Sequence, residues 1–315
     1  MPTAICACVD MAAVMTEARL AQLRRDGCGT GRDEGYKAWI RIRRKLSSPV
    51  SNLHSMTNPM YRRSLNLLSG LEFSAANVAL WLGANEVREQ HPFWPEEHPH
   101  PCTGRHPDLD RELGPAPGLL DLAKEAGIKH GVYPGTRLPF VATIDFTVAT
   151  GAWHASRLTH WSCKPRSLLD SAPNRERMLE RIELERMYSH AVYAVHVVID
   201  GTHFTRDLIA NLDWCRPLRS EMRCPAHRDR LPEFCGLFMS CAQDSIERAI
   251  RFAAEKMMIP KLDSEALFRT AAWLGLINID LSVPIILSRP LRRDSTQLKE
   301  RLRKELLGEQ VCVSR

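Results

Sequence analysis

The residues best placed to do chemistry lie in the stretch TIDFTVATGAWHASRLTHWSCKP, residues 143–165. Asp145 falls in one apolar run, and Ser162 and Lys164 end the next with one residue between them. Residues two apart in a strand face the same side, so Ser162 and Lys164 would share a face. If the two strands pair, an acid lies beside a lysine, as metal-dependent phosphodiester cleavage requires.

The same spacing also has an ordinary explanation. An Asp at a strand end is often a turn residue, and a terminal Lys is often simply solvated. Nucleases of this type usually carry a carboxylate or an amide where this chain has Ser162. Glu72, in a preceding predicted helix, could supply another oxygen ligand. The spacing alone therefore leaves a nuclease centre and an ordinary β-hairpin both open.

The elements around these residues predict an α/β protein. Apolar residues at three- and four-residue steps predict a helix over 69–82, which Ser69 would cap. A loop rich in Pro and His is predicted at 94–118. In chain order, the remaining elements are strands at 85–92, 140–148, 160–164 and 191–200, and helices at 119–127 and 174–190. This order predicts a mixed central sheet flanked by helices.

The composition changes after Trp214, which predicts a second domain. Residues 215–234 are interpreted as a linker, followed by helices at 238–256 and 263–275, a short β-hairpin within 274–287, and a helix at 295–307. These elements are typical of a small winged-helix-like unit. The predicted division is an N-terminal extension (1–34), an α/β domain (35–215) and a C-terminal winged-helix-like domain (216–315).

Charge is moderately positive, with 43 Lys plus Arg against 37 Asp plus Glu and a net charge of +6. This balance permits a polyanionic partner without requiring one. The basic residues concentrate between 35 and 68, where aromatic residues lie among them. They suit either a DNA phosphate backbone or a solvated strand edge. The candidate DNA contacts are Arg41, Arg43, Arg44, Lys45, Arg62 and Arg63.

The ten cysteines have irregular spacings, and the N-terminus lacks the basic region of a secretory signal. No apolar run approaches the roughly 20 residues of a membrane helix. A cytoplasmic protein with free thiols is expected. One group leaves zinc open as an alternative, although only Cys224 and His227 have the tight spacing of a structural site. Its members are Cys215, Cys224, His227, Cys235 and Cys241.

Several segments, in order and spacing, resemble the TnsA family, the endonuclease subunits of heteromeric bacterial cut-and-paste transposases. The resemblance covers roughly residues 36–215 and is most specific at SGLE beside REQ-x-P, at TIDF, and at SCKP followed by ELER. Residues 267–285 also look like the second domain of that family, less specifically. The resemblance implies a restriction-endonuclease-like catalytic domain.

Site roles follow from the resemblance. Glu72 matches the helical catalytic Glu, Asp145 the metal-bridging Asp, and Lys164 the catalytic Lys. Mg²⁺ is the implied cofactor, with Mn²⁺ as a substitute, and the backbone carbonyl of Cys163 is an implied further ligand. The family has Gln where this chain has Ser162, whose short hydroxyl could reach a metal only through water. We therefore expect the site to bind magnesium more loosely. Nearby, Glu89 and Gln90 are expected to border the site, either supporting Arg or Lys contacts or forming a surface strand edge.

The resemblance also implies partners. Subunits of this type hydrolyse the non-transferred strand of double-stranded DNA at the transposon 5′ ends, while a TnsB-like transposase cuts the 3′ ends. A TnsC-like AAA+ ATPase contacts the C-terminal domain, which points to residues 225–315 here. The expected location is the bacterial cytoplasm, on the nucleoid. The alternative is a nuclease-fold assembly subunit, catalytically weakened by Ser162, that bridges the transposase and the regulator.

Overall fold

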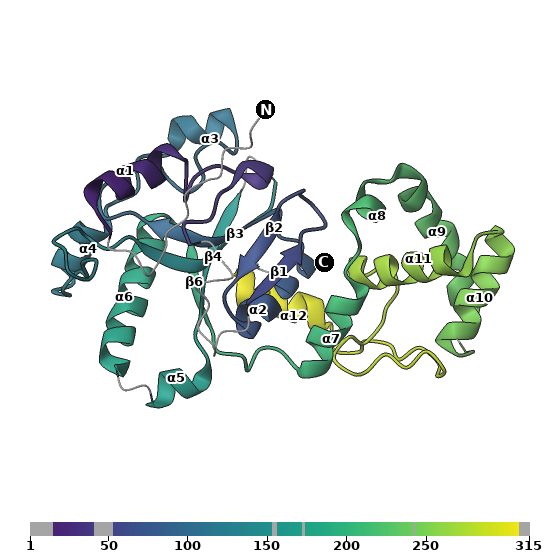
Figure 1. The fold of residues 1–315 in the computed structure, drawn as a ribbon. Coiled ribbons are helices and arrows are strands. Elements are labelled where there is room, and N and C mark those ends of the chain that lie inside the picture. The colour runs from purple at the N-terminus through teal and green to yellow at the C-terminus, as the bar shows by residue number, and fades with distance from the viewer. Residues whose placement is uncertain (1–14, 41–52, 153–155, 172–173, 242, 309–315) are drawn as a thin grey trace.

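A four-stranded mixed sheet lies at the centre of the protein (Figure 1). The computed structural model describes residues 15–40, 53–152, 156–171, 174–241 and 243–308. In sheet order the strands are β3 (Glu86–Phe93), β4 (Ala142–Thr150), β5 (Arg157–Cys163) and β6 (Val195–Ile199). The first three are antiparallel, and β6 runs parallel to β5. The predicted α/β architecture is confirmed at this level.

Helices cover both faces of the sheet, and each face has its own apolar core. One core joins the sheet to α2 (Gly70–Trp81), α7 (Arg206–Cys215) and α12 (Leu298–Leu307). The other joins it to α4 (Leu119–Glu125) and α6 (Arg175–Ala191). The stretch 94–118, expected to be a loop, contains the short helix α3 (Pro107–Glu112), which begins at a proline because that position needs no hydrogen-bond donor.

The start of α2 fixes one predicted site residue in place. Ser69 caps the helix as expected, because its hydroxyl accepts a hydrogen bond of 3.1 Å from the backbone N–H of Glu72. Ala75, Ala76 and Ala79 are fully buried and let the helix lie close to the sheet. Glu72 itself is buried in the first turn, beneath the strand ends.

The ladder between β3 and β4 is interrupted at one position, beside the site. Glu89 pairs with Phe146 and His91 pairs with Ile144, while Gln90 and the facing Asp145 are not paired, although the register continues unchanged. Gln90 has a φ of 47°, in the left-handed region that favours glycine. Its backbone carbonyl accepts a hydrogen bond of 3.2 Å from the N–H of Trp39. This local conformation costs about 1–3 kcal/mol and occurs where the strand faces Asp145.

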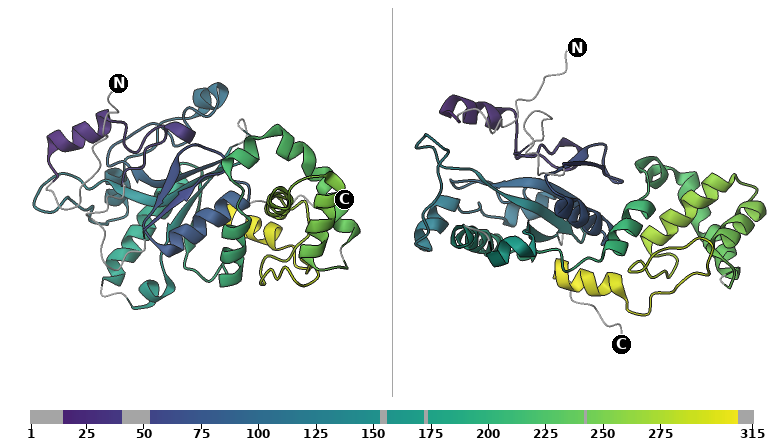
Figure 2. Two further views of the ribbon diagram at one scale, coloured as in Figure 1. Left: turned by 45° about the vertical axis from the view of Figure 1, so that its right-hand side comes forward. Right: turned by 60° about the horizontal axis from the view of Figure 1, so that its bottom comes forward.

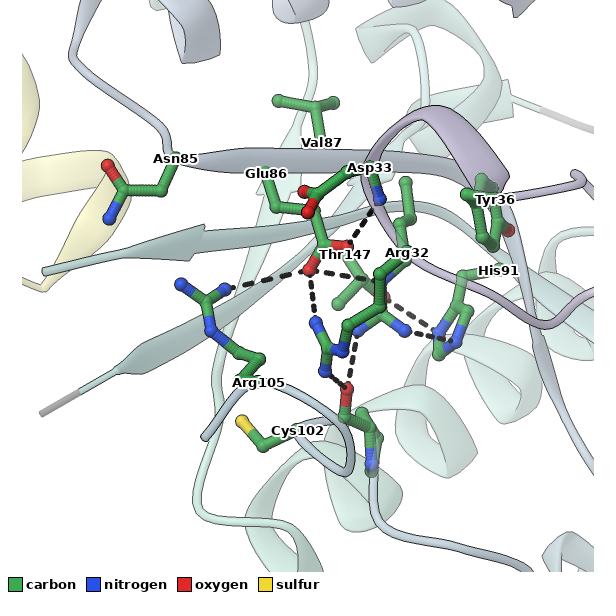
Figure 3. A network of polar contacts seen from close by, with 12 residues as sticks. Arg32, Asp33, Tyr36, Asn85, Glu86, Val87, His91, Cys102, Arg105 and Thr147 are labelled. Atoms are coloured by element: carbon green, nitrogen blue, oxygen red, sulfur yellow. Dashed lines mark hydrogen bonds and ion pairs between the residues drawn. The ribbon is translucent and has the colours of Figure 1, made fainter. Parts of the chain in front are cut away.

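The described part of the N-terminal extension is fastened to β3 by arginines (Figure 3). It contains α1 (Glu17–Arg25) and the 3₁₀ turn η1 (Asp33–Gly35). Arg32 contacts Glu86 at 2.5 Å, and Arg105 lies 3.5 Å from the same carboxylate. Burial alone would raise the pKa of Glu86, but the surrounding guanidiniums lower it overall. The carboxylate therefore stays ionised and holds the extension against the sheet.

A two-stranded sheet packs beside α2. It consists of β1 (His54–Thr57) and β2 (Ser64–Leu67), paired antiparallel. Met56, Leu65 and Leu67 are buried in the same core as α2. The connection between the two strands carries Arg63, one of the predicted DNA contacts.

The C-terminal part is more helical than expected. The predicted linker at 215–234 is wrong, because it contains α8 (Arg219–Arg223) and most of α9 (Pro225–Ser240). Leu231, Phe234 and Phe238 recur at helical spacing and are buried, which outweighs the proline-rich composition. The predicted helices are α10 (Ile246–Met257) and α11 (Lys261–Leu274).

The predicted β-hairpin within 274–287 is also wrong. This stretch lies in the described part of the chain and forms turns and extended backbone without a paired strand. The side chain of Asn211, on α7, donates hydrogen bonds of 2.9 Å and 2.7 Å to the carbonyls of Leu281 and Val283. These carbonyls are thus satisfied by a helix side chain in place of a partner strand.

The last helix returns to the sheet. Figure 2 shows α12 lying beside the sheet and α2, away from α8 to α11. The indole N–H of Trp161, on β5, donates a hydrogen bond of 3.0 Å to the carbonyl of Leu306. The two parts of the chain therefore share one apolar core. No helix within the described residues has both the length and the apolar character to cross a membrane.

Acid should destabilise the protein through His160, which is fully buried on β5. Its Nδ1 lies 2.8 Å from the hydroxyl of Ser189, and its Nε2 has no hydrogen-bond partner among the described residues. Burial lowers the pKa of His160 to about 3, below the ordinary 6.5. The unfolded state therefore binds an extra proton below pH 6.5, and stability falls by up to about 1.4 kcal/mol per pH unit.

We expect His160→Gln to flatten this dependence in urea unfolding at pH 7.5, 6 and 5. The exposed His190, on α6, provides a matched control as His190→Gln. The control should keep the slope of the wild type. An unchanged slope in His160→Gln would contradict the assignment.

Candidate active site

A buried ion pair joins Asp145, inside β4, to Lys164, which directly follows β5. The carboxylate of Asp145 accepts, at Oδ2, a hydrogen bond of 2.6 Å from Nζ of Lys164 and one of 2.7 Å from the backbone N–H of Cys163. The side chains of Asp145 and Lys164 are only 11% and 16% exposed. The two strands do pair antiparallel, with Phe146 opposite Trp161. The predicted meeting of acid and lysine is therefore present.

Glu72 approaches the pair from α2. Its Oε2 accepts a hydrogen bond of 2.9 Å from the N–H of Leu68 and a long one of 3.5 Å from the side chain of Gln90. Gln90 in turn accepts a hydrogen bond of 3.1 Å from the hydroxyl of Thr143. Gln90 thus places an amide between the helix acid and the strand that carries Asp145.

The charges of the three residues interact. Burial and the negative charge of Asp145 raise the pKa of Glu72 to about 8, against a smaller opposing effect of Lys164. Burial alone would lower the pKa of Lys164, but Asp145 and Glu185 raise it overall. Lys164 therefore carries its proton at neutral pH. Glu72 holds its proton at neutral pH in metal-free protein, and loss of that proton would add a negative charge that the single ammonium does not balance.

Ser162 is turned toward α6, away from the face of the sheet that α2 and Glu72 cover. It is fully buried, and its hydroxyl donates to Glu185 on α6 and lies 2.8 Å from Nε2 of His196. Cys163 contributes instead to the core on the α2 side. The predicted alternation of these two neighbours is present. The hydroxyl of Ser162 is occupied by its two partners, so we assign it no role as a metal ligand.

Glu185 is the site residue that sequence reasoning missed. It is 2% exposed, and Oε1 accepts a hydrogen bond of 3.1 Å from Nε of Arg181. Its charge also supports the protonated form of Lys164. A signal was present in the sequence, because Glu185 lies three and four residues before Tyr188 and Ser189, on the buried side of the helix.

The donor set of this cluster suits a hard divalent cation. The described residues contain no group of three or more His, Cys, Asp or Glu side chains that could hold a metal. Mg²⁺ typically needs only one or two carboxylates, because it keeps waters and binds substrate phosphates. Glu72, Asp145 and the carbonyl of Cys163 meet that requirement. Among the described residues, both hydrogen bonds to Asp145 end on Oδ2, which leaves Oδ1 for another ligand.

The predicted DNA contacts have different outcomes. Arg62 is exposed, as a phosphate contact requires. For Arg63 the expectation is wrong, because its Nη1 lies 2.7 Å from Glu89 and its Nη2 donates a hydrogen bond of 2.6 Å to the carbonyl of Val87. Its guanidinium also lies over the ring of Tyr36 and is a structural group. Arg41, Arg43, Arg44 and Lys45 lie outside the described residues.

The cysteines of the possible zinc group lie on different elements. Cys215 is buried at the end of α7, and Cys224 is exposed between α8 and α9. Cys235 and Cys241 belong to α9 and its C-terminal end. Nε2 of His227 lies 3.1 Å from the hydroxyl of Thr270.

Comparison with protein-family models gives no match for this chain, and comparison with curated proteins gives none either. The function is therefore inferred from the residues of the chain and from their arrangement.

In metal-free protein, stability should fall as pH rises, through Glu72. The folded protein binds a proton here up to about pH 8, whereas an unfolded Glu releases it near pH 4.5. Stability from this group is therefore lost between these pH values. Added magnesium should raise the stability more at pH 8.5 than at pH 6. The carboxyl of Glu72 must lose its proton to bind the ion, and at pH 8.5 it has largely done so.

We expect Glu72→Gln to remove both effects in urea unfolding with EDTA or with Mg²⁺. The exposed Glu112 provides the control as Glu112→Gln, which should behave as the wild type. Equal pH dependence in wild type and Glu72→Gln would show that this carboxylate is not the group concerned.

Restoring the amide at position 162 should not improve the site. Ser162 is fully buried, so the larger side chain of Ser162→Gln does not fit its space and displaces Glu185. This overpacking should lower the free energy of unfolding by about 1–3 kcal/mol. The melting temperature should fall by several degrees, and cleavage should not rise. Ser64→Gln, at an exposed position of β2, should change neither. A gain in cleavage with Ser162→Gln would contradict this geometry and favour a weakened site.

Proposed function

We propose that this chain is a divalent-metal-dependent DNA endonuclease of the TnsA type, with a restriction-endonuclease-like catalytic domain. Its reaction would be hydrolysis of the non-transferred strand at transposon 5′ ends. The observation that carries the proposal is the single carboxylate of Asp145, which holds both the ammonium of Lys164 and the N–H of Cys163 beside Glu72.

The two carboxylates would hold the cofactor. Glu72 and Asp145, together with the carbonyl of Cys163, are assigned as ligands of Mg²⁺, with Mn²⁺ as a substitute. When bound, the ion supplies the Lewis acid that polarises the scissile phosphate. The buried position of both carboxylates limits their motion, and the hydrogen bond from Leu68 fixes one oxygen of Glu72.

Lys164 would stabilise negative charge on the phosphate. Its ammonium is held by Asp145 and supported by the charge of Glu185, so it is protonated and oriented before any substrate arrives. Glu185 acts through Lys164 and is a positioning residue. The short Ser162 leaves room for Glu185 beneath the strand, where a longer amide would not fit.

Partners are proposed from the family resemblance. The exposed Arg62 fits phosphates of double-stranded DNA, and such contacts carry no base specificity. End recognition would then come from a TnsB-like transposase in the bacterial cytoplasm. Residues 225–315 are proposed, from the same resemblance, to contact a TnsC-like AAA+ ATPase.

Asp145→Ala should abolish cleavage at the 5′ ends. We expect a rate at least about a hundredfold lower, because the substitution removes a metal ligand and the anchor of Lys164. The assay contains Mg²⁺, the partner transposase and DNA carrying the ends of its element. Asp121→Ala, at an exposed position of α4, should cleave as the wild type does.

Two results would overturn the enzymatic assignment. The first is cleavage at the 5′ ends that persists in Asp145→Ala. The second is a wild-type protein that cleaves nothing in Mg²⁺ or Mn²⁺ while still assisting 3′ cleavage by the transposase. The second result would identify an assembly subunit.

A further inference from the structure

A cavity of about 410 Å³ opens beside Lys164. It lies on the face of the sheet that α4, α5 (Arg166–Ser171) and α6 cover, on the side of the molecule away from α8 to α11 (Figure 1). Its volume is within the range of about 300–1,000 Å³ that is typical of small-ligand sites. It is continuous with the proposed active site, because Lys164 and Glu185 line both.

The walls of the cavity are mostly apolar. Phe140, Met178 and Leu184 line it from the start of β4 and from α6. Phe140 packs against Tyr133, with ring centroids 5.0 Å apart, yet remains 36% exposed. Aromatic and apolar walls of this kind suit the face of a nucleobase, which stacks on such side chains regardless of sequence.

The charged residues of the cavity are mostly cationic. Lys164, Arg177 and Arg181 all line it, against the buried carboxylate of Glu185. Arg181 is fixed, because its Nη2 donates a hydrogen bond of 2.9 Å to the carbonyl of Thr143 and its Nε contacts Glu185. Arg177 is half-exposed and forms an ion pair with an exposed neighbour on its own helix, Glu180. This excess of positive charge complements phosphates on either side of a base.

We propose that this cavity takes one unstacked nucleotide of the DNA strand that is cut. The inference rests on the proposed function, because Lys164 is the group assigned to the scissile phosphate. The nucleotide next to that phosphate is the one within reach of the cavity. A base that stays stacked in a duplex cannot lay its face against the walls of this cavity, so the base must leave the duplex. The substrate class is therefore DNA that is open, or readily opened, beside the cleaved bond.

Binding of a single nucleotide tests the proposal without cleavage. The probe is thymidine 3′,5′-bisphosphate, titrated calorimetrically into the full chain in EDTA. Its comparison is the same bisphosphate of deoxyribose without a base. We expect the thymidine compound to bind at least about tenfold more tightly, because only it places a base against the apolar walls. Equal affinity for the two compounds would overturn the proposal, because it would show that the protein binds the phosphates and not the base.

Two variants locate the binding. Met178→Trp fills the cavity. This variant should bind the thymidine compound no more tightly than the baseless compound. Leu179→Trp adds the same bulk on the exposed side of α6 and should bind as the wild type does. If both variants behave alike, the nucleotide binds elsewhere and the proposal fails. Phe140→Ala gives a second test, because it removes an aromatic side chain from the cavity wall and adds no bulk. It should lower the affinity for the thymidine compound and leave the affinity for the baseless compound unchanged.

Failure of this inference differs from failure of the proposed function. Glu72→Gln should still bind the thymidine compound, because Glu72 lies on α2 and is not among the residues that line the cavity. If the wild type binds the nucleotide but never cleaves DNA, the proposed nuclease function fails and the proposed nucleotide site stands. If the Met178→Trp variant cleaves DNA with the Michaelis constant of the wild type, the proposed nucleotide site fails and the nuclease function stands.

Discussion

The proposed centre depends on the ion pair between Asp145 and Lys164. A carboxylate and an ammonium this well buried are stable only together, because removing either leaves an unpaired charge at a cost of about 3–5 kcal/mol. The N–H of Cys163 binds the same oxygen, so the pair also fixes how β5 ends beside β4. Burial and Asp145 raise the pKa of Glu72 to about 8, so this carboxyl holds a proton at neutral pH and becomes a second negative charge when the proton leaves. The proposed centre would therefore release a proton when a cation binds.

The half of the chain that forms the sheet could be predicted because local and tertiary preferences agree there. In α2 the serine cap, the apolar period and the buried alanines all favour the same helix. The apolar runs of β3, β4 and β5 are long enough to show their strands, and residue alternation placed Ser162 and Cys163 on opposite faces. The contact between Asp145 and Lys164 could be predicted because adjacent strands were expected to pair. Glu72 was predicted as a site residue from the family resemblance and from its place on a preceding helix.

Other features depend on contacts that no local pattern reveals. The proline-rich stretch 215–234 forms helices because Leu231, Phe234 and Phe238 find a core made by distant elements. Arg63 looked like a surface cation, but Glu89 sits beside it across a sheet edge that only the fold creates. Glu185 was missed among the charges of α6, since alternating charge usually indicates a solvated helix face. Its spacing from Tyr188 and Ser189 indicates the buried side of the helix, but its partners Ser162 and His196 become known only from the fold.

The return of α12 to β5 makes the strand that ends beside Lys164 depend on a segment far away in the sequence. Trp161 finds its backbone partner only when Leu306 has packed against the sheet. Cys163 belongs to the apolar core that α12 helps to close. Undocking of this one helix would therefore loosen the support of the proposed centre without touching any of its polar residues.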